Sequence, residues 1–309
     1  MSIVTSQQLA RYYEQYKTMD VTFNKQVISA TGLVARNVYL KVQDRQIPCA
    51  VFSSSMAGAR IIATMSPAVM MALKQVNNRM SLRWCFKLPD KVEPITFFVT
   101  CHPASFTHYA VQGPDVQIVT AEFTQRPPDD LILILGSLLE ANANAHRRKD
   151  ERIEITPETM KRLGLDTREG GLVIGTTSHR CVLRDLSFSG AKVVASGSAA
   201  YFMGKRAVLK ITRGDQAAEI TVQGSVRRVD EVGGRKDILA VSLEYDGDPP
   251  MTYKLLINSY LSSLRKTPQE TPAEVKPAAA PKPAAPAADA PMLVPEDVPD
   301  VEGNDSTNG

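Results

Sequence analysis

Short stretches in which apolar and polar residues alternate recur through the first 125 residues of the chain. This alternation is the pattern of β-strands that bury one face. A helical spacing of apolar residues precedes them at 6–18. The first 125 residues therefore predict a β-rich α+β domain that opens with a helix. The expected strands are 38–42, 60–64, 94–101 and 116–123, with a short helix at 69–74.

The segment 126–146 has the features of a connector between two domains. Asp129 and Asp130 follow two prolines, and either carboxylate can cap a helix. An apolar run and an Ala-rich run then continue to Ala145. We expect one helix over 129–145.

Residues 147–265 show the clearest alternation and predict a small β-barrel. Thr156 followed by Pro157 is a helix-start signal, and Gly164 is a plausible stop for that helix. A last helix begins after Pro249, and we expect its leucines to pack on the barrel. The expected strands are 153–155, 181–184, 191–194, 207–211, 219–223 and 239–245, and the leucines are Leu255, Leu256 and Leu261.

Composition separates the end of the chain from the rest. Residues 266–309 are rich in Pro and Ala, contain no aromatic residue, and carry three Lys against eight Asp or Glu. Such a segment cannot bury enough apolar surface to order itself, so we expect disorder. Because the whole chain has a net charge of +3, the first 265 residues carry +8. This mild basic excess suits an anionic ligand.

Several functional classes find no support. No apolar run is long enough to span a membrane, and the N-terminus does not resemble a signal peptide. The four cysteines and four histidines lack metal-ligand spacing, and the motifs of phosphate loops, dinucleotide folds and hydrolases are missing. Widely spaced cysteines fit reduced thiols in the cytoplasm. We therefore expect a cytoplasmic protein that is not an enzyme, with no catalytic residues, no metal and no cofactor.

Two motifs in the second block carry the candidate chemistry: Arg148-x-x-x-Arg152 and Asp185-x-Ser187-x-x-Gly190. A guanidinium group binds phosphate bidentately and also pairs with guanine O6 and N7. A carboxylate is an acceptor suited to the N–H edge of guanine, and a hydroxyl adds a further hydrogen bond. Glycine allows a close backbone approach. Either motif alone is common in linkers and turns, whereas their combination favours binding of a guanine nucleotide.

Together these motifs resemble the two signatures of PilZ domains, and the resemblance covers 147–265. It implies a mainly β (α+β) chain of two domains. The second domain would be a six-stranded PilZ barrel with a terminal helix that binds cyclic di-GMP. Arg148 and Arg152 would hold phosphate and guanine, Asp185 and Ser187 would read a guanine edge, and Gly190 would shape the turn.

The first block resembles PilZN-type modules, on the stretches Tyr12-Tyr-Glu-Gln-Tyr, Ile47-Pro-Cys-Ala-Val and Arg60-Ile-Ile. This resemblance implies a PilZ-like barrel without ligand motifs. The block does contain Arg79-x-x-x-Arg83, but no Asp-x-Ser-x-x-Gly follows it, so we place no second site there.

Other basic residues near the motifs leave alternatives open. Arg147 is either a third phosphate contact or a solvated neighbour. Arg184 should point away from Asp185 on a strand, which favours a surface role. The Arg227-Arg228 pair lines the ligand pocket or, as we prefer, is a solvated strand end. The stretch from 152 to 185 is long for the family, which suggests an insertion.

The sequence thus predicts a cyclic di-GMP receptor whose ligand changes the angle between two domains and so signals to an unidentified protein effector. Motility and virulence are the outputs associated with such receptors. The alternative is a PilZ scaffold for protein–protein interaction that ignores the nucleotide. Nucleic acid is an unlikely partner, because Asp150 and Glu151 interrupt the short basic cluster at 147–149.

Overall fold

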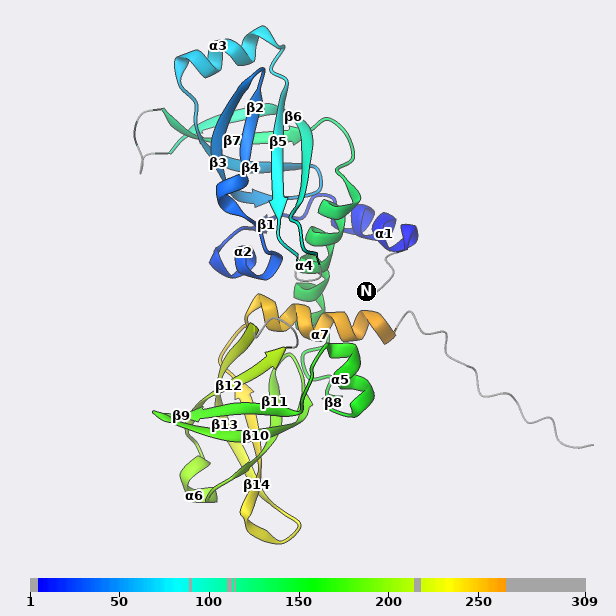
Figure 1. Cartoon of the computed structure of the whole chain (residues 1–309), viewed down its shortest axis with the longest axis vertical. Helices are drawn as coiled ribbons and strands as arrows, with labels where there is room; N and C mark the ends of the chain where they lie inside the picture. Colours follow the sequence, from blue (N-terminus) through cyan, green and yellow to red (C-terminus); the bar gives the residue numbers. More distant parts are fainter. Residues whose placement is uncertain (1–4, 89–90, 110–112, 114, 214–217, 265–309) are drawn as a thin grey trace, which may run out of the picture. The chain divides into compact units, whose positions relative to one another are not determined.

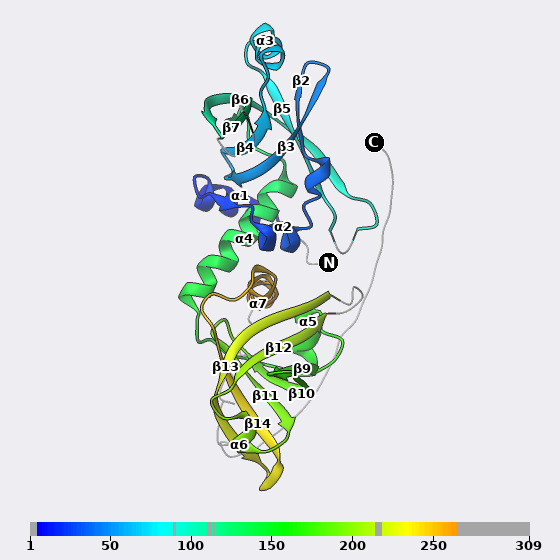
Figure 2. The same ribbon diagram turned by 90° about the vertical axis from the view of Figure 1, so that its left-hand side faces the viewer.

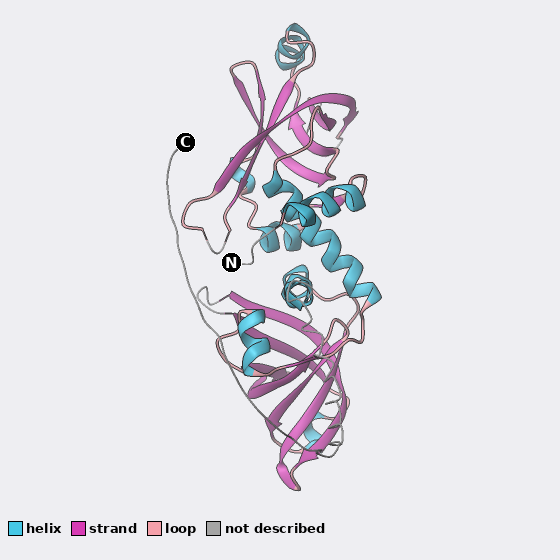
Figure 3. Ribbon diagram, turned by 90° about the vertical axis from the view of Figure 1, so that its right-hand side faces the viewer, coloured by secondary structure: helices cyan, strands magenta, loops and turns pink. Residues whose placement is uncertain are grey.

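A computed structural model describes residues 5–88, 91–109, 113, 115–213 and 218–264. They form two antiparallel β-barrels with helices at their ends (Figures 1 and 3). The predicted disordered tail, 266–309, lies outside the described residues. None of the described helices is long and apolar enough to cross a membrane.

The N-terminal barrel is a closed ring of six strands. They follow the order β3–β2–β5–β6–β7–β4, and β4 pairs back onto β3. A two-residue strand, β1, adds to the outer side of β3. The elements are α1 (Ser6–Tyr16), β1 (Val21–Thr22), α2 (Lys25–Thr31), the 3-10 helix η1 (Ala35–Asn37), β2 (Tyr39–Val42), β3 (Arg45–Ser54), β4 (Gly58–Thr64), α3 (Pro67–Gln75), β5 (Met80–Phe86), β6 (Ile95–His108), β7 (Val116–Phe123) and α4 (Asp129–Arg147).

The C-terminal barrel is a second closed ring of six strands, in the order β10–β9–β12–β13–β14–β11, and β11 pairs back onto β10. The two-residue strand β8 adds to β10. Helix α6 lies at the end of this barrel away from α7, where Phe202 is buried (Figure 2). The elements are β8 (Ile153–Glu154), α5 (Pro157–Leu163), β9 (Glu169–Ile174), β10 (Thr177–Leu186), β11 (Gly190–Ser196), α6 (Ala199–Phe202), β12 (Arg206–Arg213), β13 (Ala218–Val232), β14 (Arg235–Tyr245) and α7 (Met251–Leu264).

The two barrels have the same topology, strand for strand. β1 corresponds to β8, β3 to β10 and β4 to β11, and the two rings follow the same sequence of neighbours. The turn after β3 ends at Gly58 and the turn after β10 ends at Gly190, and the residue numbers in the two turns differ by 132. The chain therefore contains one supersecondary unit twice.

Matching caps support this repeat. The side chain of Asn24 accepts a hydrogen bond from the first turn of α2, and Thr156 does the same for α5. Both helices end at a glycine in the left-handed conformation, Gly32 at φ 69° and Gly164 at φ 69°. Short polar caps and a left-handed glycine are the residues that start and end helices.

Each barrel has its own hydrophobic core. Trp84 and Phe86 stack at 5.7 Å in the N-terminal cluster, whereas Leu256 and Leu261 of α7 pack into the C-terminal cluster. Leu255 packs against the N-terminal cluster instead, contrary to our expectation for it. Helix α7 thus uses different faces for the two cores.

Polar side chains link α4 to α1 and α7. Tyr12 Oη and Arg11 Nη2 of α1 each donate to the carboxylate of Glu140 at 2.7 Å. From α7, Ser262 Oγ donates to the same carboxylate at 3.1 Å and Asn258 Nδ2 at 3.3 Å. The Glu140 side chain is 5% exposed, so a single buried carboxylate joins three helices.

Most predicted elements are confirmed, with three differences. The stretch from 152 to 185, where we expected an insertion, also holds the barrel strand β9 beside α5. Helices α2, η1 and α6 and strands β1, β3, β5 and β9 were not predicted. The N-cap of α4 is Pro128 and makes no side-chain hydrogen bond, so Asp129 and Asp130 lie in the first turn. There the negative carboxylates interact favourably with the positive N-terminal end of the helix dipole.

Candidate ligand-binding site

The Asp185–Gly190 motif forms the turn between β10 and β11, and two of its residues build that turn. Ser187 is fully buried, and its Oγ accepts from the Gly190 N–H at 3.1 Å. A Cβ on Gly190 would lie 2.2 Å from the carbonyl oxygen of Leu243, so only glycine fits. In this structure Ser187 and Gly190 therefore set the shape of the turn, and Ser187 does not face solvent.

Arg152 and Asp185 are brought together although they are far apart in sequence. Strand β8 pairs with β10 so that Glu154 lies opposite Asp185. Arg152, which precedes β8, then donates from Nη1 to Asp185 Oδ1. The Asp185 side chain is 17% exposed and that of Arg152 50% exposed. The pair is consequently open on the guanidinium side, where a ligand can approach.

The other arginines of the first motif lie at the end of α4. Arg148 pairs with Glu151 at 3.3 Å, and its side chain is 36% exposed. Arg147 is the last residue of α4 and is exposed. Neither residue lines the hollows described below. Contact with the same ligand as Arg152 would require this junction to move.

The junction after α4 is attached to the turn. Ser189 Oγ donates to Asp150 Oδ1 at 2.9 Å, and the Ser189 N–H donates to the Lys149 carbonyl at 3.1 Å. The two motifs are therefore in direct contact in the described structure.

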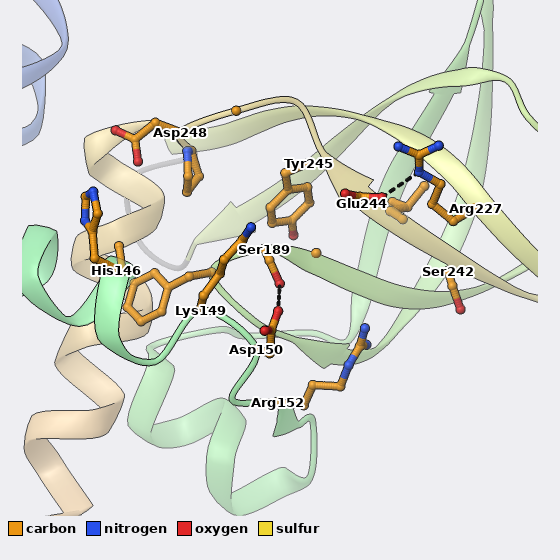
Figure 4. Close-up of a pocket in the computed structure, with 16 residues that line it drawn as sticks. His146, Lys149, Asp150, Arg152, Ser189, Arg227, Ser242, Glu244, Tyr245 and Asp248 are labelled. Carbon is orange, nitrogen blue, oxygen red and sulfur yellow. Dashed lines mark hydrogen bonds and ion pairs between the residues drawn. The ribbon is translucent and has the colours of Figure 1, made fainter.

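A hollow of about 690 Å³ lies beside this contact (Figure 4). It is lined by the end of α4, the junction, the turn, β13, β14 and the loop between β14 and α7. It is large enough for a drug-sized or dinucleotide ligand. Its lining includes the charged residues Lys149, Asp150, Arg152, Arg227, Glu244 and Asp248, together with His146, Phe188 and Tyr245.

Arg227 belongs to this lining, which corrects our preference for a solvated strand end. The pairing of β13 with β14 shifts between Val226 and Arg228, so Arg227 sits in a β-bulge. A bulge re-aims a side chain. Arg227 Nε donates to Glu244 at 2.5 Å across the rim of the hollow (Figure 4). Strand alternation alone could not reveal that Arg227 lines the hollow. The signal that the sequence did offer was an arginine close to the predicted ligand pocket.

A buried chain of hydroxyls connects the turn to α7. Tyr245 Oη donates to Tyr253 Oη at 2.9 Å, and Tyr253 Oη donates to the Ser187 carbonyl at 2.8 Å. Burial raises the pKa of both phenols well above the ordinary value, so both stay neutral donors. The turn is thus fixed from the barrel interior by the final helix.

The arrangement suits an anionic ligand that also offers hydrogen-bond donors. Guanidinium groups bind phosphate oxygens, and the carboxylate of Asp185 accepts N–H donors. In the described structure Arg148, Arg152 and Arg227 are each paired with a carboxylate. A bound phosphate would have to exchange with these carboxylates. Among the described residues no group of His, Cys, Asp or Glu could hold a metal ion.

Comparisons with known proteins identify both domains. A model of the PilZN3 domain matches residues 7–142, and a model of the PilZ domain matches 146–262. A protein of Treponema denticola described as a "Cyclic di-GMP binding protein" is 36% identical over 267 residues, which cover 86% of this chain and 85% of that protein.

Solved structures with similar folds include the Borreliella burgdorferi PlzA protein in complex with c-di-GMP. It is 20% identical, covers 82% of this chain and 98% of its own, and has a TM-score of 0.38. The PilZ domain of Escherichia coli YcgR with c-di-GMP is 15% identical, covers 38% of this chain and 92% of its own, and has a TM-score of 0.27. From the two domain matches and the Treponema relative, the chain belongs to the PilZ family, with a PilZN3 domain followed by a PilZ domain.

Proposed function

We propose that this protein is a receptor for cyclic di-GMP and not an enzyme. The observation that carries the proposal is the Arg152–Asp185 pair, which places a phosphate-binding group against an acceptor for the guanine N–H edge at the rim of a hollow. The name of the Treponema relative supports the choice of ligand.

Each motif residue has a role in this proposal. Arg148 and Arg152 hold phosphate and guanine, and Arg147 is a third candidate contact on the same junction. Asp185 reads the guanine edge. Ser187 and Gly190 support Asp185 through the turn, because the Ser187 side chain is buried and hydrogen-bonded to Gly190.

Isothermal titration tests the proposal. The wild-type chain should bind cyclic di-GMP saturably and should give no saturable heat with GTP. The double variant Arg148→Ala, Arg152→Ala should lose binding. The matched control is Arg45→Ala, Arg79→Ala, which removes the same charge from two exposed positions of the N-terminal barrel and should bind like the wild type.

Two results would contradict the proposal. If the wild type gives no heat and no thermal stabilisation with cyclic di-GMP, the chain is a nucleotide-independent scaffold for protein–protein interaction. If both double variants lose affinity equally, binding depends on overall charge and not on the motif.

We further propose that ligand binding changes the arrangement of the PilZN3 and PilZ domains and so signals to a protein effector. The hollow supports this, because it is lined by the end of α4 at His146 and by the segment that leads into α7 at Pro249. A ligand shifts the equilibrium between two domain arrangements only if it binds one of them more tightly than the other. X-ray scattering with and without cyclic di-GMP should give different curves, and superimposable curves would contradict the rearrangement.

We also propose bounds for the domains and a cellular location. We assign 1–125 to the N-terminal domain, 126–146 to the connector and 147–265 to the PilZ domain. A cytoplasmic location is supported by the cysteines, since all four are free thiols.

A further inference from the structure

A second, smaller hollow lies on the outer surface of the C-terminal barrel, beside the Arg152–Asp185 pair. Its volume is about 360 Å³, enough for one purine base. Arg152 and Asp185 line it, and so do Glu154, Arg184 and Lys192. Three cations thus face two carboxylates. Arg184 and Lys192 belong to neither ligand motif.

A β-bulge brings Arg184 to this hollow. Leu183 pairs with Val193, but Asp185 pairs with Lys192, so Arg184 is an extra residue on β10. Leu183 is buried, Arg184 is exposed and Asp185 is partly buried. Two successive side chains therefore lie on the outer face, as bulges near functional sites allow. Our prediction that Arg184 points away from Asp185 was wrong for this reason.

Arg184 differs from the other arginines of the site in its pairing. Arg152 pairs with Asp185, and Arg227 pairs with Glu244. In the part of the chain that the structure describes, the Arg184 guanidinium makes no hydrogen bond and no ion pair. A ligand can use it without breaking an existing interaction.

In the N-terminal barrel, the side chains at the positions equivalent to Arg184, Asp185 and Lys192 reach one another. Arg60 occupies the place of Lys192, and Phe52 that of Arg184, because β3 carries the same bulge between Val51 and Ser53. Arg60 Nε donates to Ser53 Oγ at 2.9 Å, and its guanidinium lies 5.0 Å from the Phe52 ring centre. A long cation at this place of β11 can therefore reach whatever is held beside Asp185.

We propose that Arg184 and Lys192 are further ligand contacts that recognise the acceptor edge of one guanine. A base whose N1–H and N2–H groups meet Asp185 carries O6 next to N1, with N7 beyond it. Arginine is the residue that pairs bidentately with O6 and N7, and Lys192 adds a donor to the same edge. Adenine carries a donor in place of O6, so both cations favour guanine. This inference rests on the proposed function.

Titration of single variants with cyclic di-GMP tests the two residues. Arg184→Ala and Lys192→Ala should each weaken binding about tenfold, the loss of one specific base contact. The matched control is Arg180→Ala, an exposed arginine of the same strand, which should stay within about twofold of the wild type. Melting temperatures should be unchanged, because these side chains lie on the barrel surface.

An analogue of cyclic di-GMP tests which edge of the guanine Arg184 contacts. Cyclic di-GMP with N7 replaced by C–H should bind the wild type about tenfold more weakly than cyclic di-GMP does, and Arg184→Ala should bind both ligands equally. If the analogue weakens binding equally in the wild type and Arg184→Ala, the contact with N7 is wrong.

The outcomes also separate this inference from the proposed function. If Arg184→Ala and Lys192→Ala bind like Arg180→Ala while Arg148→Ala, Arg152→Ala does not bind, only the inference fails. If the wild type does not bind cyclic di-GMP, the proposed function fails and the inference falls with it.

Discussion

The two barrels share a turn but not the chemistry beside it. In the C-terminal barrel the Ser187 N–H donates to the Gly190 carbonyl at 2.8 Å, and in the N-terminal barrel the Ser55 N–H donates to the Gly58 carbonyl at 2.9 Å. A Cβ on Gly58 would lie 2.4 Å from the Ala121 carbonyl oxygen, nearly as close as the 2.2 Å contact that excludes a side chain at Gly190. The Ser-x-x-Gly part of the motif is therefore a feature of the fold.

The side chains around the two turns differ in charge. Strand β1 pairs Thr22 with Ser53, so Asp20 occupies the place that Arg152 has before β8. Ser53 replaces Asp185 and donates to Asp20 at 3.2 Å, while Arg60 donates to Ser53. A carboxylate in place of the guanidinium of Arg152 repels an anionic ligand. This difference supports the proposal that Arg152 and Asp185, and not the turn, distinguish a ligand-binding barrel from one that does not bind.

The largest effect in this comparison should come from the two glycines. Gly190→Ala and Gly58→Ala both force a Cβ against backbone, and each should destabilise the chain by about 3 kcal/mol. Only Gly190→Ala should also weaken cyclic di-GMP binding, because only that turn supports Asp185. Thermal unfolding and titration of the folded variants measure the two effects.

A control glycine lies in open space. A Cβ on Gly233 would meet no atom within 4 Å, and its φ of 62° is one that asparagine tolerates, so Gly233→Asn should change stability little. Equal loss of affinity in Gly58→Ala and Gly190→Ala would contradict the assignment of the site to one barrel.

A smaller effect is expected at Glu140, which joins the helices of both barrels. Burial alone would raise its pKa, but hydrogen bonds from Tyr12 and Asn258 and the charge of Arg11 hold that pKa below the ordinary 4.5. Because the pKa is lower in the folded state, the carboxylate stabilises the fold above pH 4.5, and this contribution is lost as pH falls through the folded-state pKa.

Glu140→Gln should therefore lower the free energy of unfolding by about 1–3 kcal/mol near pH 7. The difference in the free energy of unfolding between this variant and the wild type should shrink as the pH falls below 4.5 and through the lower folded-state pKa, because the Glu140 carboxylate is then protonated. Denaturant titrations over this pH range measure it, with the exposed Glu93→Gln as the control. A difference that stays constant with pH would show that the charge of Glu140 is not the cause.

The sequence predicted the part of the site that lies in continuous motifs. Asp185 and Arg152 were identified because their residue types and order match one ligand, and the barrel around them followed from strand alternation. Arg184 and Arg227 were misplaced because alternation assumes one residue per step, whereas both lie in bulges. A PilZ-like N-terminal barrel was expected, but the turn it shares with the C-terminal barrel was missed, since Ser53-x-Ser55-x-x-Gly58 lacks the Asp that marks the second motif.

The smallest effect on binding should come from the substitution of Arg227. It tests whether a β-bulge that both barrels contain has gained a ligand contact in the C-terminal barrel. β6 has the same register shift between Pro103 and Ser105, where Ala104 takes the place of Arg227. Arg227→Ala makes the C-terminal bulge resemble the N-terminal one. It should weaken cyclic di-GMP binding about threefold to tenfold, less than loss of the motif arginines, because Arg227 is already paired with Glu244 and largely exposed.

The neighbouring Arg228 provides the control for this last effect. Its side chain is 73% exposed, pairs with Asp230 and does not line the larger hollow. Arg228→Ala should leave the affinity unchanged in the same titration. If both variants lose affinity to the same extent, the effect is one of overall charge, and both variants would show the same reduced salt dependence of binding. If only Arg227→Ala loses affinity, the bulge in β13 has acquired a contact that the N-terminal barrel lacks.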